Sequence, residues 1–311
     1  MWKDELVSYS ILDPTGNITA LVDSPIEIAD QPSLAAVLME DHPEVEQVGF
    51  VNYVASPRTD HQVELRMAGG EFCGNASMSA AALYALRCRP EGVTDVWQTV
   101  KLGVSGCAEL VKVSLVREDE KSLRAAVRMP LPLAVTRMEY SFEGIREMLP
   151  TVLMEGISHI IIEKSSAFFS LKRDAQKAEQ AVKAWCQELS AEGLGLMFLE
   201  EPSGDEAVRR LFEQAFCVGS VEEGEKPVSI IKRLTPLVYI PGSGTVFWEN
   251  SCASGSSAVG MALADQMGQA VFLTLQEPGG NLWVKSSPDK GRSWLFGRVR
   301  LVGHFSLSQQ L

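Results

Sequence analysis

The sequence predicts an α/β protein of two related halves, in which a curved sheet surrounds one helix of small residues in each half. Short β-type runs outnumber helical ones, and each half has one long small-residue segment directly after a cysteine. Each of these segments is followed by a glycine turn and then a strand with a similar order of residues. These turns and strands are Gly106–Lys112 in one half and Gly280–Lys285 in the other. A repeat of this length fits a duplicated domain and is far too long for a solenoid.

The length of 311 residues favours about two domains. Pro130 and Pro132 interrupt the β pattern, so we place the boundary near residue 134. Residues 1–134 then form the half that carries Cys73, and residues 135–302 form the half that carries Cys252. We expect the tail of about 303–311 to return to the first half.

Several segments of the first half have the composition and alternation of strands. The first two flank Asp13–Asn17, whose residues favour a turn, so we expect a hairpin there. The predicted strands are Leu6–Leu12, Ile18–Val22, Gln47–Val54, Gln62–Met67, Val100–Val104, Glu109–Val116 and Leu123–Met129.

The second half repeats this order with additions. Apolar residues at helical spacing predict helices over Lys172–Leu189 and Asp205–Phe216. His159–Glu163, Val228–Ile240 and Gly244–Trp248 are predicted strands.

Composition excludes several classes of function. The net charge of −12 argues against nucleic acid or an anionic membrane surface as partner, and no apolar stretch approaches the length of a membrane span. The segment Met1–Glu5 lacks the basic and apolar regions of a signal peptide, so we expect a cytoplasmic protein.

The cysteines and histidines show no metal or disulfide pattern. None of the six cysteines forms a CxxC pair, which favours reduced thiols. The histidines (His42, His61, His159 and His304) are isolated, so we expect no metal site.

Cys73 and Cys252 are the most informative residues of the chain. Each comes immediately before small polar residues and then a run rich in alanine, with a serine four positions after the cysteine (Ser77 and Ser256). A thiol at a helix N-terminus lies in a positive field that favours the thiolate, and free N–H groups beside it can hold a carboxylate. A single buried cysteine usually packs as a small hydrophobe. Two in matching frames instead predict a pair of thiol bases for a carboxylate-bearing substrate.

The strings around these cysteines carry a family resemblance. Glu71–Asn75 and Asn250–Ser256, together with Gly16-Asn17 and Pro278–Gly280, resemble the diaminopimelate epimerase-like family of cofactor-independent amino-acid racemases. Within that family, Glu46–Phe50, Glu71–Asn75 and Trp248–Cys252 are most similar to histidine racemases that supply D-histidine for opine-type metallophores.

The resemblance implies a fold, a mechanism and a set of residues. The fold is two pseudo-symmetric domains, each a curved, mainly antiparallel sheet around a central helix, with the active site in the interdomain cleft. The mechanism is a two-base inversion at Cα without a cofactor, in which Cys73 and Cys252 act on opposite faces. It also implies a small amino-acid substrate, most simply histidine, and a homodimer. The implied substrate-binding residues are Asn17, Glu46, Gln47, Gly74, Asn75, Ala253, Gly255 and Ser256.

This chain departs from the family at the residues that would assist the two cysteines in proton transfer. His159 falls where the family keeps a histidine beside one catalytic cysteine. The family's glutamate near the second cysteine is missing, and Glu249 is a candidate replacement. Both Glu249 and Glu46 could instead face the substrate side chain or be solvated carboxylates.

Residues that hold the second amino-acid group of diaminopimelate are also replaced. The corresponding places are apolar or small, which disfavours diaminopimelate because its second charged group would leave polar atoms unpaired. These places are Met67, Ile157, Leu196-Met197 and Ser243-Gly244.

Two other interpretations stay open at this stage. A racemase or epimerase of another polar or cationic amino acid fits the same residues. A catalytically inactive binding module of the same fold would also fit, although such a module would usually have lost one cysteine. A redox or metal-storage protein fits poorly, because the two cysteines are far apart in the chain and no histidine cluster accompanies them.

Overall fold

The computed structural model describes residues 6–54, 60–88, 97–202, 227–242, 244–289 and 293–308. The helix predicted at 205–216 lies outside the described residues. The chain divides into two compact units, which we call unit 1 (Met1–Arg128 with Phe296–Leu311) and unit 2 (Met129–Leu295). The boundary predicted near residue 134 separates two related halves of the sequence rather than two compact units, and it stays a prediction.

The sheet of unit 1 closes into a barrel. Its strands follow the order β1-β2-β3-β4-β5-β6-β7-β16, and β16 also pairs with β1, where Val7 lies opposite Leu307. β1 and β2 form the predicted antiparallel hairpin. The bounds are β1 (Val7–Pro14), β2 (Thr19–Val22), β3 (Gln47–Tyr53), β4 (Val63–Met67), β5 (Gln98–Val104), β6 (Val111–Arg117), β7 (Ser122–Arg128) and β16 (Ser293–Leu307).

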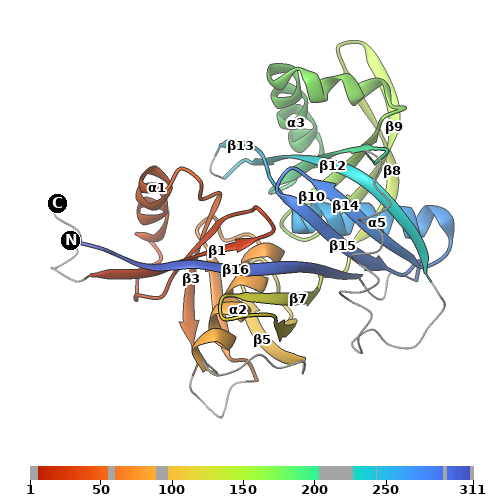
Figure 1. Cartoon of the computed structure of the whole chain (residues 1–311). Helices are drawn as coiled ribbons and strands as arrows, with labels where there is room; N and C mark the ends of the chain where they lie inside the picture. Colours follow the sequence, from red (N-terminus) through yellow and green to blue (C-terminus); the bar gives the residue numbers. More distant parts are fainter. Residues whose placement is uncertain are drawn as a thin grey trace. The chain divides into compact units, whose positions relative to one another are not determined.

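The small-residue helix α2 (Gly74–Cys88) lies inside this barrel (Figure 1). It contacts β1 to β7, and its residues from Gly74 to Leu83 are all buried. Alanine and serine side chains allow strands to approach the helix from every side, which explains why the segment is so poor in large residues. The first residue of α2 directly follows Cys73.

Helix α1 (Gln31–Asp41) was not predicted and packs against β3. Its central residues are almost all apolar, so they show no clear helical period, and only Leu34, Ala35 and Leu38 of these are buried. Periodicity therefore gave no signal at this position.

Unit 2 contains an open path of strands in the order β8-β9-β10-β11-β12-β14-β15, with β13 paired to β12. Successive side chains of β11 point to opposite faces of this sheet. Leu196 and Phe198 join the core beneath α3, whereas Met197 lies against the first turn of α5. The bounds are β8 (Ala134–Phe142), β9 (Ile145–Leu153), β10 (Ser158–Glu163), η1 (Ala167–Arg173), α3 (Ala175–Leu189), β11 (Leu194–Glu200), β12 (Val228–Ile240), β13 (Thr245–Trp248), α5 (Ala253–Met267), β14 (Val271–Glu277) and β15 (Gly280–Ser286).

The two units share one connectivity. In unit 1, α1 connects the parallel strands β2 and β3, and α2 connects the parallel strands β4 and β5. In unit 2, α3 connects parallel β10 and β11, and α5 lies between parallel β12 and β14 in the chain. Most other pairings are antiparallel. This confirms the predicted fold class of two halves, each with a mainly antiparallel sheet around a central helix.

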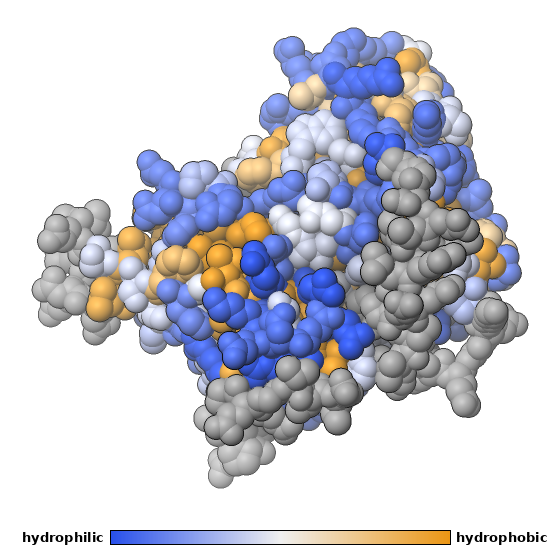
Figure 2. All heavy atoms as spheres, in the orientation of Figure 1, coloured by the Kyte–Doolittle hydropathy of each residue, from blue (hydrophilic) through white to orange (hydrophobic). Residues whose placement is uncertain are grey.

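The helix predicted over Lys172–Leu189 begins later than expected. Asp174 accepts a hydrogen bond from the Lys177 N–H (3.1 Å) and starts α3 as its N-cap, so the preceding residues form the separate helix η1. Cys186 lies in the core, as predicted. Among the described residues on the face shown in Figure 2, hydrophilic side chains predominate and hydrophobic patches lie between them.

Candidate active site: two cysteine half-sites

The first half-site is built on Cys73, at the entrance to α2. The Ser77 N–H and hydroxyl both donate to the Cys73 carbonyl (2.9 and 2.7 Å), which fixes the first turn of the helix. The Ala76 N–H donates to the Cys73 sulfur (3.3 Å). The cysteine is 7% exposed, so its sulfur is held by the helix backbone in a nearly dry environment.

Polar side chains from the start of β3 and from the β1–β2 turn complete this half-site. The Cys73 thiol donates to Gln47 Oε1 (2.7 Å), and Asn17 Nδ2 donates to Glu46 Oε2 (2.7 Å). The N–H groups of Glu46 and Gln47 both reach the Ile18 carbonyl, which ties the two segments together. Asn17 is fully buried and its Oδ1 atom has no hydrogen-bond partner among the described residues. The structure thus brings Gln47 to Cys73 and Asn17 to the adjoining Glu46, and their role in binding substrate stays a prediction.

The second half-site is built on Cys252, the N-cap residue of α5, which has extended backbone and is 5% exposed. The Ser256 N–H donates to the Cys252 carbonyl (2.8 Å), and the Gly255 N–H donates to its sulfur. The sulfur lies 3.6 Å from Ser254 Oγ. Gly255 is needed because a Cβ there would lie 2.2 Å from Met197 Sδ and 3.1 Å from the Cys252 sulfur.

Two carboxylates surround Cys252. Burial raises the pKa of the Cys252 thiol well above its usual range, and the charge and hydrogen bond of Glu249 and the charge of Glu277 raise it further. The Gly255 N–H lowers the pKa, but as a smaller effect. Cys252 is therefore a thiol, and so a potential acid, when no substrate is bound. Glu249 contacts Cys252, the cysteine beside which it is a candidate replacement for the glutamate that the family keeps.

Glu277 was not predicted. Its carboxylate accepts hydrogen bonds from the Cys252 N–H (2.8 Å) and the Ser256 hydroxyl (2.5 Å). Burial raises the pKa of the Glu277 carboxyl to about 8, with a further increase from the charge of Glu249, while its two hydrogen bonds act in the opposite direction. A signal was present, because Glu277 continues the alternation of buried residues Val271, Leu273 and Leu275 along β14. A carboxylate at the next buried position of an apolar strand needs a partner.

His159 lies in the core of unit 2, on β10 opposite Gly195. Burial lowers the pKa of its imidazole to about 3, and neither ring nitrogen has a hydrogen-bond partner among the described residues. A Cβ on Gly195 would lie 2.4 Å from His159 Nδ1 and 2.7 Å from Met197 Cε. Met197 thus packs against the histidine on one side and the Cys252 turn on the other. The role of His159 in proton transfer stays a prediction.

The remaining predicted binding residues lie in the first turns of the two helices. Gly74 and Asn75 begin α2, and Ala253, Gly255 and Ser256 begin α5. The Gly255 N–H donates to the Cys252 sulfur and the Ser256 N–H to the Cys252 carbonyl, so these two N–H groups are engaged within the turn. The N–H groups of the first helical residues, Gly74 and Ala253, have no partner four residues back within the helix and lie at the positive end of the helix dipole. The start of each helix can therefore stabilise negative charge with backbone atoms.

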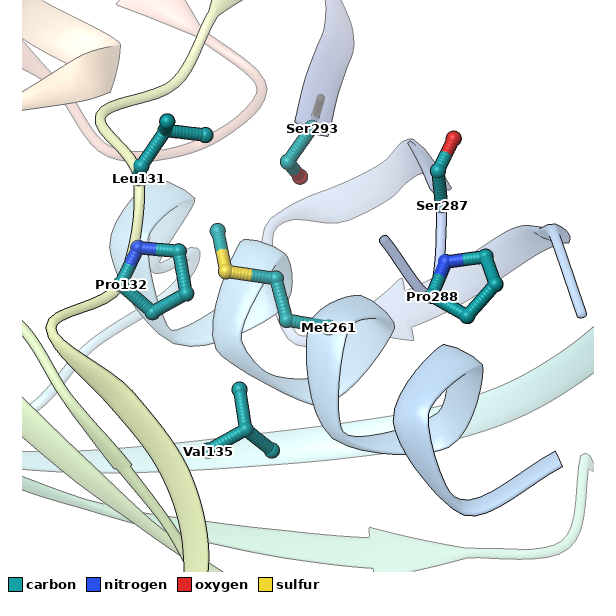
Figure 3. Close-up of a pocket in the computed structure, with 7 residues that line it drawn as sticks. All are labelled: Leu131, Pro132, Val135, Met261, Ser287, Pro288 and Ser293. Atoms are coloured by element: carbon teal, nitrogen blue, oxygen red, sulfur yellow. The ribbon is translucent and has the colours of Figure 1, made fainter. Parts of the chain in front are cut away.

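The pocket in Figure 3 is separate from both half-sites. It lies beside Met261, more than two turns along α5 from Cys252, and its volume of about 10 Å³ would hold one water molecule. Its lining has no titratable side chain: Leu131, Pro132, Val135, Met261, Ser287, Pro288 and Ser293. Within the described ranges, no group of three or more His, Cys, Asp or Glu side chains is arranged to hold a metal ion. No helix in the described part of the chain is long and apolar enough to cross a membrane.

The fold is that of racemases and epimerases. A hydroxyproline epimerase from Agrobacterium vitis superposes with a TM-score of 0.62 at 12% identity, covering 100% of this chain and 94% of that one. A probable proline racemase from Agrobacterium radiobacter K84 gives a TM-score of 0.59 at 12% identity, covering 98% and 93%. At this identity the likeness concerns the fold alone.

The sequence comparison narrows the class. A family model described as "Histidine racemase CntK N-terminal domain" matches residues 6–207 and 228–305, and the chain belongs to this family. A histidine racemase from Staphylococcus aureus (strain Mu50) is 27% identical over 292 residues, or 91% of this chain and 89% of that protein. A second, from Fusobacterium nucleatum (strain ATCC 23726), is 25% identical over 307 residues and 96% of both chains. The predicted family is therefore confirmed, and the chain is an amino-acid racemase, an isomerase.

Proposed function

We propose that this racemase interconverts L- and D-histidine without a cofactor, with Cys73 and Cys252 as the two bases. One observation carries the proposal. Each cysteine precedes the first turn of the central helix in its own unit, and in each case the N–H three residues later donates to the sulfur. Two thiols prepared in the same way are what inversion requires, because the proton must leave from one face of Cα and return from the other.

The proposed reaction has two proton transfers. One thiolate takes the α-proton, so that an S–H bond forms while the C–H bond breaks and its electron pair moves into the substrate carboxylate. The other thiol then donates its proton to the opposite face of Cα and becomes the thiolate. Atoms and electrons balance without a further reactant. The N–H groups of the two helix first turns are suited to stabilise the negative charge that develops on the carboxylate.

Histidine as substrate is supported by the names of the two sequence relatives and by the polar groups beside the cysteines. The Glu46 carboxylate, oriented by Asn17, and the Glu249 carboxylate are candidates to pair with the imidazole or the ammonium group. Diaminopimelate remains disfavoured, because four of the residues at the places of its second amino-acid group are buried and apolar: Met67, Ile157, Leu196 and Met197. Ser243 lies outside the described residues.

A panel experiment tests the substrate. The protein is incubated in heavy water with each L-amino acid, and α-deuteration and formation of the D-isomer are followed. We expect histidine to exchange and invert fastest, with activity unchanged after removal of pyridoxal phosphate and treatment with a chelator. Faster inversion of diaminopimelate, or loss of turnover on chelation that added metal restores, would overturn the proposal.

The cellular setting is part of the proposal. A cytoplasmic homodimer that supplies D-histidine to an opine-type metallophore is consistent with the family resemblance. The oligomeric state can be measured by light scattering. A strain that lacks the gene should lose the metallophore and recover it when D-histidine is supplied.

A further inference from the structure

The carboxyl group of Glu277 is a buried ionisable group of unit 2 beside Cys252, and neither the family resemblance nor the proposed chemistry gives it a role. Glu277 is the last residue of β14 and is 7% exposed. Its Oε2 atom accepts from the Cys252 N–H (2.8 Å), and its Oε1 atom accepts from the Ser256 hydroxyl (2.5 Å). Both oxygens are thus directed at one turn of one helix, the turn that holds the second thiol.

This contact supplements the cap of the helix. The N-cap residue of α5 is Cys252, whose side chain offers only a sulfur, which accepts from the Gly255 N–H. Glu277 supplies a carboxyl group from a different strand, at the helix end where a negative charge is favourable once the group ionises. It engages the N-cap N–H and a side chain one turn later. The N–H groups of Ala253 and Ser254, which have no partner four residues back within the helix, lie in the same first turn.

Charged and titratable groups face Cys252 from several elements. Glu249 faces it from the segment between β13 and α5, and Glu277 from the end of β14. His159 of β10 lies behind Met197 and is neutral, since its pKa is about 3. Because the pKa of Glu277 is about 8, its charge develops only at alkaline pH, which is where Cys252 would otherwise lose its proton.

We propose that Glu277 is the positioning residue of the Cys252 half-site, which holds the first turn of α5 and keeps Cys252 in the thiol form that donates the proton. This inference deepens the proposed function and rests on it for its catalytic meaning. The contact of Glu277 with the turn, and its effect on the thiol, can be tested without any substrate.

The first experiment measures the thiols directly. Carbamidomethylation by iodoacetamide is followed across pH for the intact protein, and the labelled Cys73 and Cys252 peptides are quantified separately by mass spectrometry. In the Glu277→Gln variant we expect the Cys252 midpoint to fall by about 1 pH unit, because a like charge has been removed. Cys73 is the internal control and should not move. An unmoved Cys252 midpoint, or equal shifts at both cysteines, would overturn the proposal.

The second experiment measures racemisation across pH. The rate requires one thiol to be protonated, so the alkaline limb of kcat/KM should move to lower pH in Glu277→Gln. A residue that only stabilises the fold would lower the rate at every pH and leave both limbs in place. Glu163→Gln, at the exposed end of β10, is the matched control and should leave the profile unchanged. If no amino acid is racemised, the proposed function fails, whereas the labelling experiment still decides the role of Glu277.

A second variant separates the effect of the charge of Glu277 from the effect of its side-chain length. Glu277→Asp keeps the carboxylate but shortens the side chain by one methylene, so its hydrogen bonds to the α5 turn are stretched or lost. We expect its Cys252 midpoint to stay within about half a pH unit of wild type and kcat to fall about tenfold or more. Should Glu277→Gln fail to fold, a wild-type kcat in Glu277→Asp would by itself contradict the positioning role.

Discussion

The two half-sites use the same helix geometry but surround their sulfur atoms with different chemistry. In both, the N–H three residues after the cysteine donates to the sulfur, and a serine lies four residues after it. Ser77 turns back to the Cys73 carbonyl, whereas Ser256 reaches the Glu277 carboxylate. Cys73 donates to the neutral amide of Gln47, and Cys252 lies between two carboxylates.

This difference shows how a duplicated element can serve two roles. The proposed mechanism needs one thiolate and one thiol at the same moment, although the two arise from the same structural pattern. The carboxyl groups of Glu249 and Glu277 favour the protonated form of Cys252, whereas the group that accepts the Cys73 hydrogen bond is a neutral amide. We infer that the surroundings of Cys252 favour its action as the acid.

Loss of either thiol should have the largest effect. Cys73→Ser and Cys252→Ser conserve size, so both variants should fold, but a hydroxyl is a far weaker acid than a thiol, so almost none of it is ionised to act as the base. We expect racemisation to fall by at least about a thousandfold in each. Cys186→Ser is the matched control, because Cys186 is a buried residue of α3 that packs in the core of unit 2, and it should keep near wild-type activity. Near wild-type racemisation in Cys73→Ser or Cys252→Ser would make that cysteine structural.

His159 should make unit 2 sensitive to acid. Its pKa is lowered from 6.5 to about 3 on folding, so the unfolded chain binds a proton between these values and stability is lost as pH falls through this range. At pH 5 the loss relative to pH 8 should be about 2 kcal/mol. Urea unfolding of wild type and His159→Leu at both pH values measures the effect. The same pH dependence in both proteins would contradict the buried, neutral histidine.

The two serines should give the smallest effects and the sharpest comparison. Ser77→Ala removes a hydrogen bond to a carbonyl and should cost about 1 kcal/mol at any pH. Ser256→Ala removes a donor from a carboxylate whose pKa is about 8, so its cost should rise to about 2 kcal/mol once pH exceeds that value. Urea unfolding at pH 7 and pH 9 compares them. Equal, pH-independent costs would mean that Glu277 is not ionised in this range.

The local sequence pattern was sufficient to predict much of the fold and to single out the two cysteines. Cys73, Cys252 and the helices that follow them could be identified because small residues after a polar helix start are uncommon and occur twice. The strands near Gln47 and Val228 followed from their composition. Helix α1 was missed because its apolar residues lack a period, and the start of α3 was misplaced because Asp174 caps it.

Contacts between distant segments account for what the sequence did not predict. Glu277 lies 25 positions after Cys252, and nothing local connects the end of β14 with the first turn of α5. Its pairing depends on the register of β14 in the sheet, which is a tertiary property. The same holds for Met197, whose contact with Gly255 requires both the sheet and the helix to be in place.

Turnover of an elimination-prone amino acid by the two serine variants tests the central claim most directly. Elimination needs only a base on one face of Cα, so each variant should still release the leaving group from one enantiomer with its remaining cysteine as the base, more slowly in Cys73→Ser because Cys252 is held in the thiol form. We predict that the reactive enantiomer is opposite in Cys73→Ser and Cys252→Ser, while neither variant racemises histidine. The same enantiomer reacting in both variants, or both enantiomers reacting in one, would contradict a mechanism in which each thiol serves one face.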